Sequence, residues 1–378
     1  MSAPAAAPGR EPWRSERGAR TLLSRIAEPY DETVQELVAE HGVLDLVGYA
    51  VRDGRTPDGV PLTRLLSRLE RSLGVDEEQV TRALGVRVLV PGDEEWPAGL
   101  DDLGAVPWAL WVRGPLRLDE AAGGSVGVVG SRASSSYGDE TAARIAFDLA
   151  ERGRTVVSGA AYGIDAAAHR AALAVDEGRT VAVLAGGVDV AYPRSNVDLI
   201  ARVGQHGALV SETPPGGAPA RMRFLSRNRI IAALSVGTLV VECGLRSGAR
   251  NTVAHARELG RHVMAVPGPV GSALSAGCHE EIRAGAVLVT DADEVIEQVG
   301  RMGKDLAPVK RGRVEPQDDL TPETRRVWQW LRPRRSVSVD EVMVRSGLAL
   351  GEVLVALSEL EERGLAEQLL DGWKRRSG

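Results

Sequence analysis

The chain has 378 residues, of which 43% are hydrophobic and 26% are charged, and its formal net charge is −6. This composition predicts a globular protein of two or three domains and excludes a disordered chain. No apolar run reaches the ~18 residues of a membrane helix, and two cysteines are too few for a disulfide framework, so we expect a cytoplasmic protein with no membrane contact and with Cys243 and Cys278 buried.

The first 85 residues are expected to contain a tail and a small helical domain. Residues 1–19 have no basic segment followed by an apolar core, which excludes a signal peptide and predicts a disordered tail. Residues 20–85 form the expected helical domain, because TVQELVAEHGVLDLV and LTRLLSRLERSL place apolar residues at helical spacing between glycines. Residues 86–118 form a mixed connector whose ends, VRVLV and WALWV, suit strands.

Residues 120–300 alternate between short β-branched segments and intervals long enough for a helix. The expected strands are SVGVVGS, TVVSGA, TVAVLAG, ALVSE, GTLVVE, HVMAVPG and AVLVT. This alternation predicts βαβ crossovers and an α/β fold, in which a doubly wound, mostly parallel, Rossmann-like sheet is covered by helices on both faces.

The C-terminal part is expected to be a winged helix joined by a linker. Residues 301–318 are polar and without period, and residues 319–378 contain three helical segments and a short hairpin. Thr321 is the expected cap of the first helix, with Pro322 at its first position. The third helix, ALGEVLVALSELEERG, carries four glutamates and one arginine, so we expect it to contact protein rather than duplex DNA.

Ligands of an open parallel sheet bind at the carboxyl ends of the strands, and Gly130, Ser131 and Arg132 follow the first of these strands. The segment lacks the third glycine of a dinucleotide fingerprint, and the chain has no G-x-x-x-x-G-K-S/T loop. A glycine turn before a helix binds anions through its backbone N–H groups, and an arginine adds a bidentate fork for phosphate. The alternative is a tight turn with an exposed arginine.

The next two strands also end in glycine-rich turns. The glycines that allow a close backbone approach are Gly159, Gly163, Gly186 and Gly187. Asp165 is expected to cap the following helix, with His169 packed one turn later, although an Asp–His acid–base pair is the alternative. Asn196 is either a cap or a polar contact.

The stretch RMRFLSRNR, at residues 221–229, follows the fourth strand and leads into the helix RNRIIAALS. It carries Arg221, Arg223, Phe224, Arg227, Asn228 and Arg229, and no acid. Arginine is common throughout the chain: 43 of the 46 basic residues are arginines, and the other three are Lys304, Lys310 and Lys374. The cluster therefore also fits compositional bias. The fifth strand adds Arg246, Ser247, Gly248 and Arg250. Arginines interleaved with an aromatic ring are typical of proteins that bind single-stranded nucleic acid, so the pattern favours binding over catalysis. The alternative for Phe224 is a core residue beneath the loop.

These motifs together resemble the DprA/Smf family. The matching segments are GSR, SGAAYGIDAAAH, GGVDVAYPRSN, SETPPG, FLSRNRIIAALS, VECGLRSGARNTVAHA, GRHVMAVPGPV and SAGCHEEIRAGA, within residues 86–300. The resemblance implies a Rossmann-like single-stranded DNA-binding domain, flanked by a SAM-like helical domain and a winged helix. Gly130, Ser131 and Arg132 would then line one side of the DNA pocket, and Phe224, Arg227, Asn228 and Arg229 the other. Leu225 and Cys243 depart from the family's usual proline and alanine.

The resemblance further implies a homodimer formed through the Rossmann-like domain, which loads RecA recombinase onto incoming DNA during natural transformation and has no enzymatic activity or cofactor. One alternative is a nucleotide hydrolase resembling the lysine-decarboxylase-like phosphoribohydrolases. Its glycine-rich signature is only partly matched, by Gly237, Thr238 and Glu242 in LSVGTLVVE. A second alternative is an adaptor that acts through the winged helix.

Overall fold

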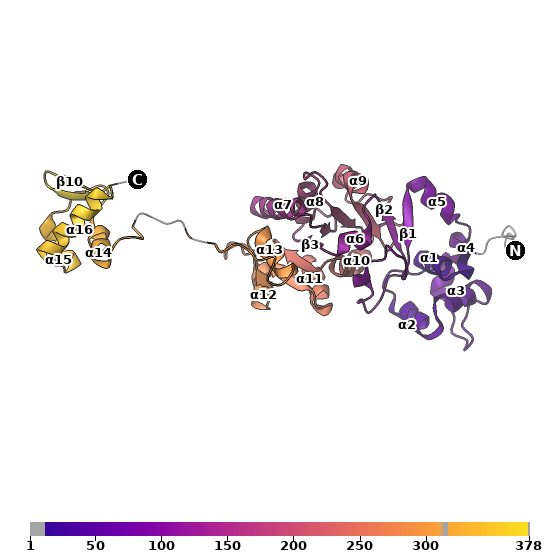
Figure 1. The fold of residues 1–378 in the computed structure, drawn as a ribbon. Helices are drawn as coiled ribbons and strands as arrows, with labels where there is room; N and C mark the ends of the chain where they lie inside the picture. The colour runs from indigo at the N-terminus through magenta and orange to yellow at the C-terminus, as the bar shows by residue number, and fades with distance from the viewer. Residues whose placement is uncertain (1–11, 311, 313–316, 377–378) are drawn as a thin grey trace. The chain divides into compact units, whose positions relative to one another are not determined.

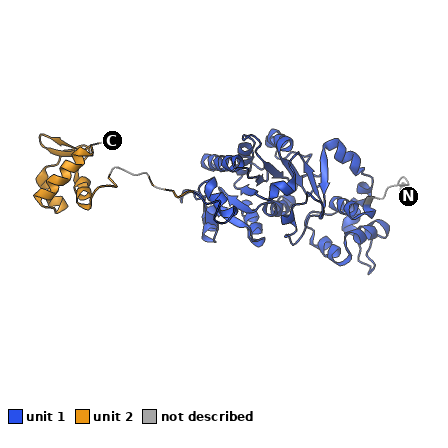
Figure 2. Ribbon diagram, viewed as in Figure 1, with its two compact units in different colours: residues 1–307 blue, residues 308–378 orange. Residues whose placement is uncertain are grey.

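The computed structural model of the protein describes residues 12–310, 312 and 317–376. The chain divides into two compact units, residues 1–307 and 308–378 (Figure 2). Within the described residues, no helix has both the length and the apolar character needed to span a bilayer. Cys243 and Cys278 are buried free thiols, as the sequence predicts.

The first unit is built on a sheet whose strand order, among the described residues, is β1-β2-β6-β5-β4-β3-β7-β8-β9 (Figure 1). The strands are β1 (Val86–Leu89), β2 (Leu110–Arg113), β3 (Val126–Val129), β4 (Val156–Ser158), β5 (Thr180–Val183), β6 (Ala208–Ser211), β7 (Gly237–Val240), β8 (His262–Ala265) and β9 (Val287–Leu288). Strands β3 to β9 pair in parallel, and β1 and β2 add an antiparallel edge next to β6. The predicted α/β class and all seven predicted strands are therefore confirmed.

Strand β3 is the point at which the sheet changes direction. It pairs with β4 on one side and with β7 on the other, so the chain winds outward from β3 both ways. Its side chains alternate between the two faces, with Val126 and Val128 in one core cluster and Val129 in another. Both faces are covered, which explains why the strands read as continuous apolar runs.

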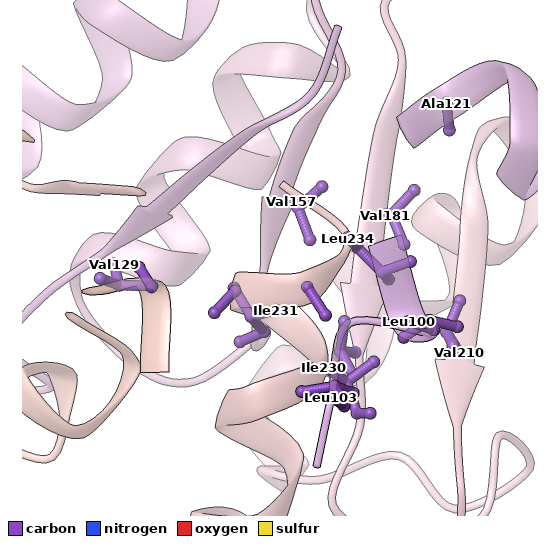
Figure 3. Packing of buried hydrophobic residues seen from close by; sticks show 14 of the residues in the cluster. Leu100, Leu103, Ala121, Val129, Val157, Val181, Val210, Ile230, Ile231 and Leu234 are labelled. Carbon is purple, nitrogen blue, oxygen red and sulfur yellow. The ribbon is translucent and has the colours of Figure 1, made fainter. Parts of the chain in front are cut away.

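Helices cover both faces of this sheet. They are α6 (Leu118–Ala122), α7 (Ser136–Glu151), α8 (Ile164–Ala172), α9 (Val197–His206), α10 (Arg221–Ala233), α11 (Ala249–Glu258), α12 (Ala276–Arg283) and α13 (Ala292–Val299). Helix α7 begins at the cap Ser135, whose hydroxyl accepts a hydrogen bond from the N–H of Gly138. Helix α10 buries Ile230 and Ile231, and its C-cap Leu234, in a core cluster that also contains Leu100 (Figure 3).

The N-terminal helices belong to the same compact unit as the sheet. They are α1 (Glu16–Ile26), α2 (Glu32–His41), α3 (Val43–Arg52), α4 (Thr63–Leu73) and α5 (Glu77–Leu84). Trp108, which comes just before β2, packs into their core, and the guanidinium of Arg25 lies 4.9 Å from the centre of the Trp111 ring. Figure 1 shows these helices beside β1 and β2. The predicted boundary at residues 85 and 86 therefore does not separate two compact units.

One expectation for this region differs from the structure. Residues 12–19 form a short 3-10 helix (Pro12–Arg14) and the start of α1, capped by Ser15, rather than part of a tail. Residues 1–11, the rest of the predicted tail, lie outside the described residues. The ends of the connector at residues 86–118 form β1 and β2, as their composition predicts, and both strands belong to the sheet.

The second unit has the predicted winged-helix order of elements. These are α14 (Pro322–Trp330), α15 (Val339–Ser346), α16 (Leu350–Glu362), β10 (Ala366–Leu369) and β11 (Gly372–Arg375). Thr321 caps α14 as expected, because its hydroxyl accepts a hydrogen bond of 3.2 Å from the N–H of Thr324. Leu357 of α16 and Trp373 of β11 are buried in its core.

Candidate nucleic-acid interface

A pocket of about 620 Å³ opens at the carboxyl ends of β3 and β7, where the sheet changes direction. Ligands of open α/β sheets bind at such a point because the loops that follow the two strands diverge to opposite sides. The pocket is lined by the β3–α7 loop, by one face of α10 and by the β7–α11 loop. Among the predicted site residues, it is lined by Gly130, Ser131, Arg132, Arg221, Phe224, Arg227, Asn228, Ser247 and Gly248.

The turn after β3 is held in one conformation by its neighbours. The N–H of Ser131 donates to the carbonyl of Glu242 at 2.6 Å, and the carbonyl of Ser131 accepts from Ile164 at 3.2 Å. A Cβ on Gly130 would lie 2.5 Å from Cγ1 of Ile164 and 2.8 Å from the carbonyl oxygen of Glu242. Glycine is therefore required here, and Arg132 projects from a rigid support.

The Glu242 carboxylate also fixes the start of α7. Its two oxygens accept from the backbone N–H of Ser135 at 2.8 Å and from the Ser135 hydroxyl at 2.7 Å. The side chain is buried, so this acid, although close to the turn, does not present its charge to the pocket.

The arginine cluster does not converge on one groove. We expected a loop before the helix RNRIIAALS, but α10 begins at Arg221 and contains the whole cluster. Successive residues of an α-helix point about 100° apart, so the four arginines face different surroundings. Arg221 is exposed at the pocket, whereas Arg223 forms an ion pair of 2.9 Å with Glu28 of the N-terminal helical segment.

Arg229 is also directed away from the pocket. Its side chain, only 3% exposed, forms an ion pair with Glu212 and donates to the carbonyl of Ala105 at 2.8 Å. Burial raises the pKa of Glu212, although the positive charge of Arg229 opposes this effect. The prediction that Arg229 lines the pocket is wrong, because its charge is paired inside the protein.

Arg227 lies in the floor of the pocket rather than at its mouth. It is buried and donates to the carbonyl of Val183, and it passes so close to Gly159 that a Cβ there would overlap the guanidinium. Burial lowers the pKa of Arg227 to about 10, so the side chain remains protonated at neutral pH. Arg227 therefore contributes a fixed positive charge from below.

Asp165 organises the turn after β4 instead of capping a helix. It lies in the first turn of α8, whose N-cap is Gly163, and its carboxylate accepts from the N–H groups of Gly159 at 3.1 Å and Ala161 at 3.3 Å. Burial raises the pKa of Asp165, and the charge of Arg227 opposes the shift.

The Asp–His pair that the sequence left open is absent from the structure. Nδ1 of the buried His169 lies 2.7 Å from the hydroxyl of Thr180, so the packed histidine is confirmed. Burial, and secondarily Arg227, lowers the pKa of His169 to about 3.

The remaining predicted glycines have packing roles. A Cβ on Gly163, which has a φ of +69°, would overlap the carbonyl of Ser131, so this glycine supports the pocket turn. Gly186 and Gly187 do not line the pocket, because they pack against the loop before α10, where the N–H of Gly187 donates to the carbonyl of Gly217 at 2.8 Å. Asn196 makes a polar contact through its amide to the carbonyls of Ala160 and Ala161, at 3.1 Å each.

Three exposed arginines therefore surround the pocket: Arg132, Arg221 and Arg246. None of the three forms an ion pair within the residues that the structure describes. By contrast, Arg250, in the first turn of α11, is paired with Glu281 at 2.6 Å. Exposed guanidinium groups around a pocket are suited to binding phosphates.

Phe224 supplies an aromatic surface at this pocket. The guanidinium carbon of Arg132 lies 4.9 Å from the centre of its ring, and the ring of Tyr192 lies 5.6 Å away on a different loop. Phe224 is partly exposed, so it is not the core residue that the alternative predicted. Tyr192 was not among the predicted site residues, and its signal in the sequence is the YP pair of VDVAYPRSN, which follows the third predicted strand.

Sequence comparisons place this chain in a known family. The family described as DNA recombination-mediator protein A matches residues 87–300, and the DprA winged helix domain matches residues 312–372. A DNA processing protein DprA of Mycobacterium tuberculosis is 46% identical over 363 residues, covering 93% of this chain and 92% of that protein. Protein Smf of Escherichia coli is 40% identical over 295 residues, covering 76% of this chain and 77% of that protein.

Solved structures give the same result. DNA processing protein A from Streptococcus pneumoniae superposes with a TM-score of 0.61 and 32% identity, over 75% of this chain and 98% of that one. DNA processing protein A from Helicobacter pylori, whose structure describes its single-stranded DNA binding mode, gives 0.51 and 26%, over 56% of this chain and 94% of that one. The chain therefore belongs to the DNA recombination-mediator protein A family, the DprA/Smf family that its motifs resemble.

Proposed function

We propose that the chain binds single-stranded DNA in the pocket at the ends of β3 and β7 and acts as a recombination mediator. The observation that carries the proposal is the contact of Arg132 with the Phe224 ring at the mouth of a pocket surrounded by unpaired arginines. Guanidinium groups neutralise backbone phosphates and an aromatic ring stacks on a base, which together bind a single strand without regard to sequence. The Helicobacter pylori relative, which binds single-stranded DNA, supports the same ligand.

The finer role that we propose is to protect incoming DNA and to load RecA recombinase onto it during natural transformation. The chain would act as a homodimer in the cytoplasm, as a binding protein rather than an enzyme. Membership of the recombination-mediator family supports this role. Sedimentation of the purified protein tests the dimer, and gel shifts of DNA with and without RecA test the loading.

The direct test compares the affinities of single- and double-stranded oligonucleotides for the full chain by fluorescence anisotropy at several salt concentrations. If Arg132, Arg221 and Arg246 each neutralise one phosphate, the logarithm of affinity falls with the logarithm of salt with a slope of about −2. Arg132→Glu should abolish binding without altering the thermal transition, because this side chain is exposed. Equal affinity of wild type and variant would show that the strand binds elsewhere.

The nucleotide-hydrolase alternative is not favoured by the surroundings of Glu242. Both of its carboxylate oxygens accept hydrogen bonds from Ser135, and Thr238 is buried within β7. Neither residue lines the pocket. Incubation with nucleoside monophosphates, followed by assay for a released base, checks this conclusion.

A further inference from the structure

We infer that Tyr192 provides a second base-stacking surface, outside the pocket, for a nucleotide adjacent to the one that stacks on Phe224. The inference rests on the proposed function, since it extends the path of a bound single strand. Its basis is the contact between the two rings, whose centres are 5.6 Å apart and whose planes are inclined by 57°.

The order of the three side chains gives the path a direction. Arg132 and Phe224 line the pocket, whereas Tyr192 does not, so Tyr192 lies beyond Phe224 as seen from the pocket. Arg132 follows β3 and Tyr192 follows β5, and β4 lies between these two strands in the sheet. A strand that leaves the pocket over Phe224 and passes Tyr192 therefore runs across the carboxyl end of the sheet, from β3 toward β5.

The exposure of Tyr192 fits a role in binding rather than in packing. Its side chain is 47% exposed, and no residue in the described part of the chain hydrogen-bonds to its hydroxyl. The neighbouring Pro193 is buried and Arg194 is exposed, with no ion pair to any described residue. Arg194 therefore adds an exposed positive charge two residues from the exposed Tyr192 ring, and single-strand binders combine aromatic rings with cationic side chains.

The loop that carries Tyr192 is fixed before any ligand binds. The N–H of Gly216 donates to the Asp189 carboxylate at 2.9 Å, and Asn196 bonds the carbonyls of Ala160 and Ala161. These contacts hold the loop on both sides of the tyrosine. A rigid aromatic surface loses little conformational entropy when a base stacks on it, which increases the affinity that one ring can supply.

The test is an abasic scan of a bound oligonucleotide with the full chain. The oligothymidylate should be the shortest one that reaches full affinity, so that it cannot slide to avoid a missing base. One base at a time is removed, and affinities are measured for wild type, Tyr192→Ala and Tyr192→Phe. In the wild type we expect two adjacent positions at which loss of the base weakens binding by about tenfold.

In Tyr192→Ala, loss of the base at one of these positions should no longer weaken binding, while the other position remains sensitive. Tyr192→Phe should retain the wild-type profile, since the ring and not the hydroxyl makes the contact. Phe224→Ala should remove sensitivity at the other position and serves as the matched control. Thermal melts that agree among the variants confirm that all of them are folded.

Two results would overturn the inference and leave the proposed function intact. One is an unchanged abasic profile in Tyr192→Ala. The other is an equal loss of affinity at every position, which would show that Tyr192 only supports Phe224. Failure of the wild type to bind any single strand would instead remove the proposed function itself.

Discussion

Replacement of Arg229 by methionine tests the separation of the arginine cluster into a binding part and a structural part. The substitution keeps an unbranched side chain of similar length but removes the charge that pairs with Glu212. The two side chains are 3% and 8% exposed, so the glutamate would be left buried without its counter-charge. Removing one partner of a buried pair costs about 3–5 kcal/mol.

The expected change is measured by calorimetry of the full chain. The larger unit should give the transition of larger enthalpy, because unfolding enthalpy scales with the number of residues. For a unit of this size the loss lowers its Tm by about 5–8 °C. DNA affinity, measured well below the transition, should remain within about twofold of wild type, because Arg229 does not line the pocket.

The double variant Arg229→Met/Glu212→Gln is the matched control. It leaves no buried charge, so we expect it to recover much of the lost stability. The single variant should also become relatively more stable as the pH falls. Burial already raises the pKa of Glu212 in the folded protein. The folded state therefore takes up a proton at this carboxyl more readily than the unfolded chain, so the free energy of unfolding increases as the pH falls and the carboxyl becomes protonated. A single variant that melts like wild type, or that stays folded but fails to bind DNA, would refute this assignment.

Three further predictions concern the pocket and its support. Arg221→Ala should weaken single-strand binding, reduce the salt slope by about 0.7 and leave the Tm unchanged, whereas an unchanged slope would contradict a phosphate contact. Gly130→Ala should reduce affinity in anisotropy measurements, because the added methyl meets Ile164 and displaces the turn that carries Arg132; wild-type affinity would show that the turn tolerates a side chain. The pKa of His169 is about 3 in the folded protein, against an ordinary value of 6.5. At pH values between these two, the unfolded chain binds a proton that the folded protein does not, so stability falls as the pH falls. Between pH 6.5 and 5 this amounts to about 2 kcal/mol in denaturant melts, and His169→Gln should lose that part of the pH dependence while an unaltered profile would contradict it.

Much of the fold could be predicted from the sequence because its signals are local. The parallel strands are covered on both faces, so each is a continuous apolar run, and glycine-rich turns mark where each strand ends. The rule that ligands bind at the carboxyl ends of the strands then selected segments that line the pocket, including the turn at Gly130 and the helix that begins at Arg221. The doubly wound class, the winged helix and the region of the pocket follow from these patterns.

The sequence could not determine which arginines face the pocket. Residues 221–227 contact the pocket, the N-terminal helical segment and the core in turn, so the first turns of α10 have no apolar periodicity. In addition, the N-cap residue Ala220 has no side chain that could cap the helix. Arg223 and Arg229 are neutralised by Glu28 and Glu212, which lie on other elements and become neighbours only after folding. The contact of Tyr192 with Phe224 likewise joins a loop and a helix that are distant in sequence. Charge in a sequence is a property of residues, but the charge available to a ligand depends on which partners the tertiary structure brings within reach.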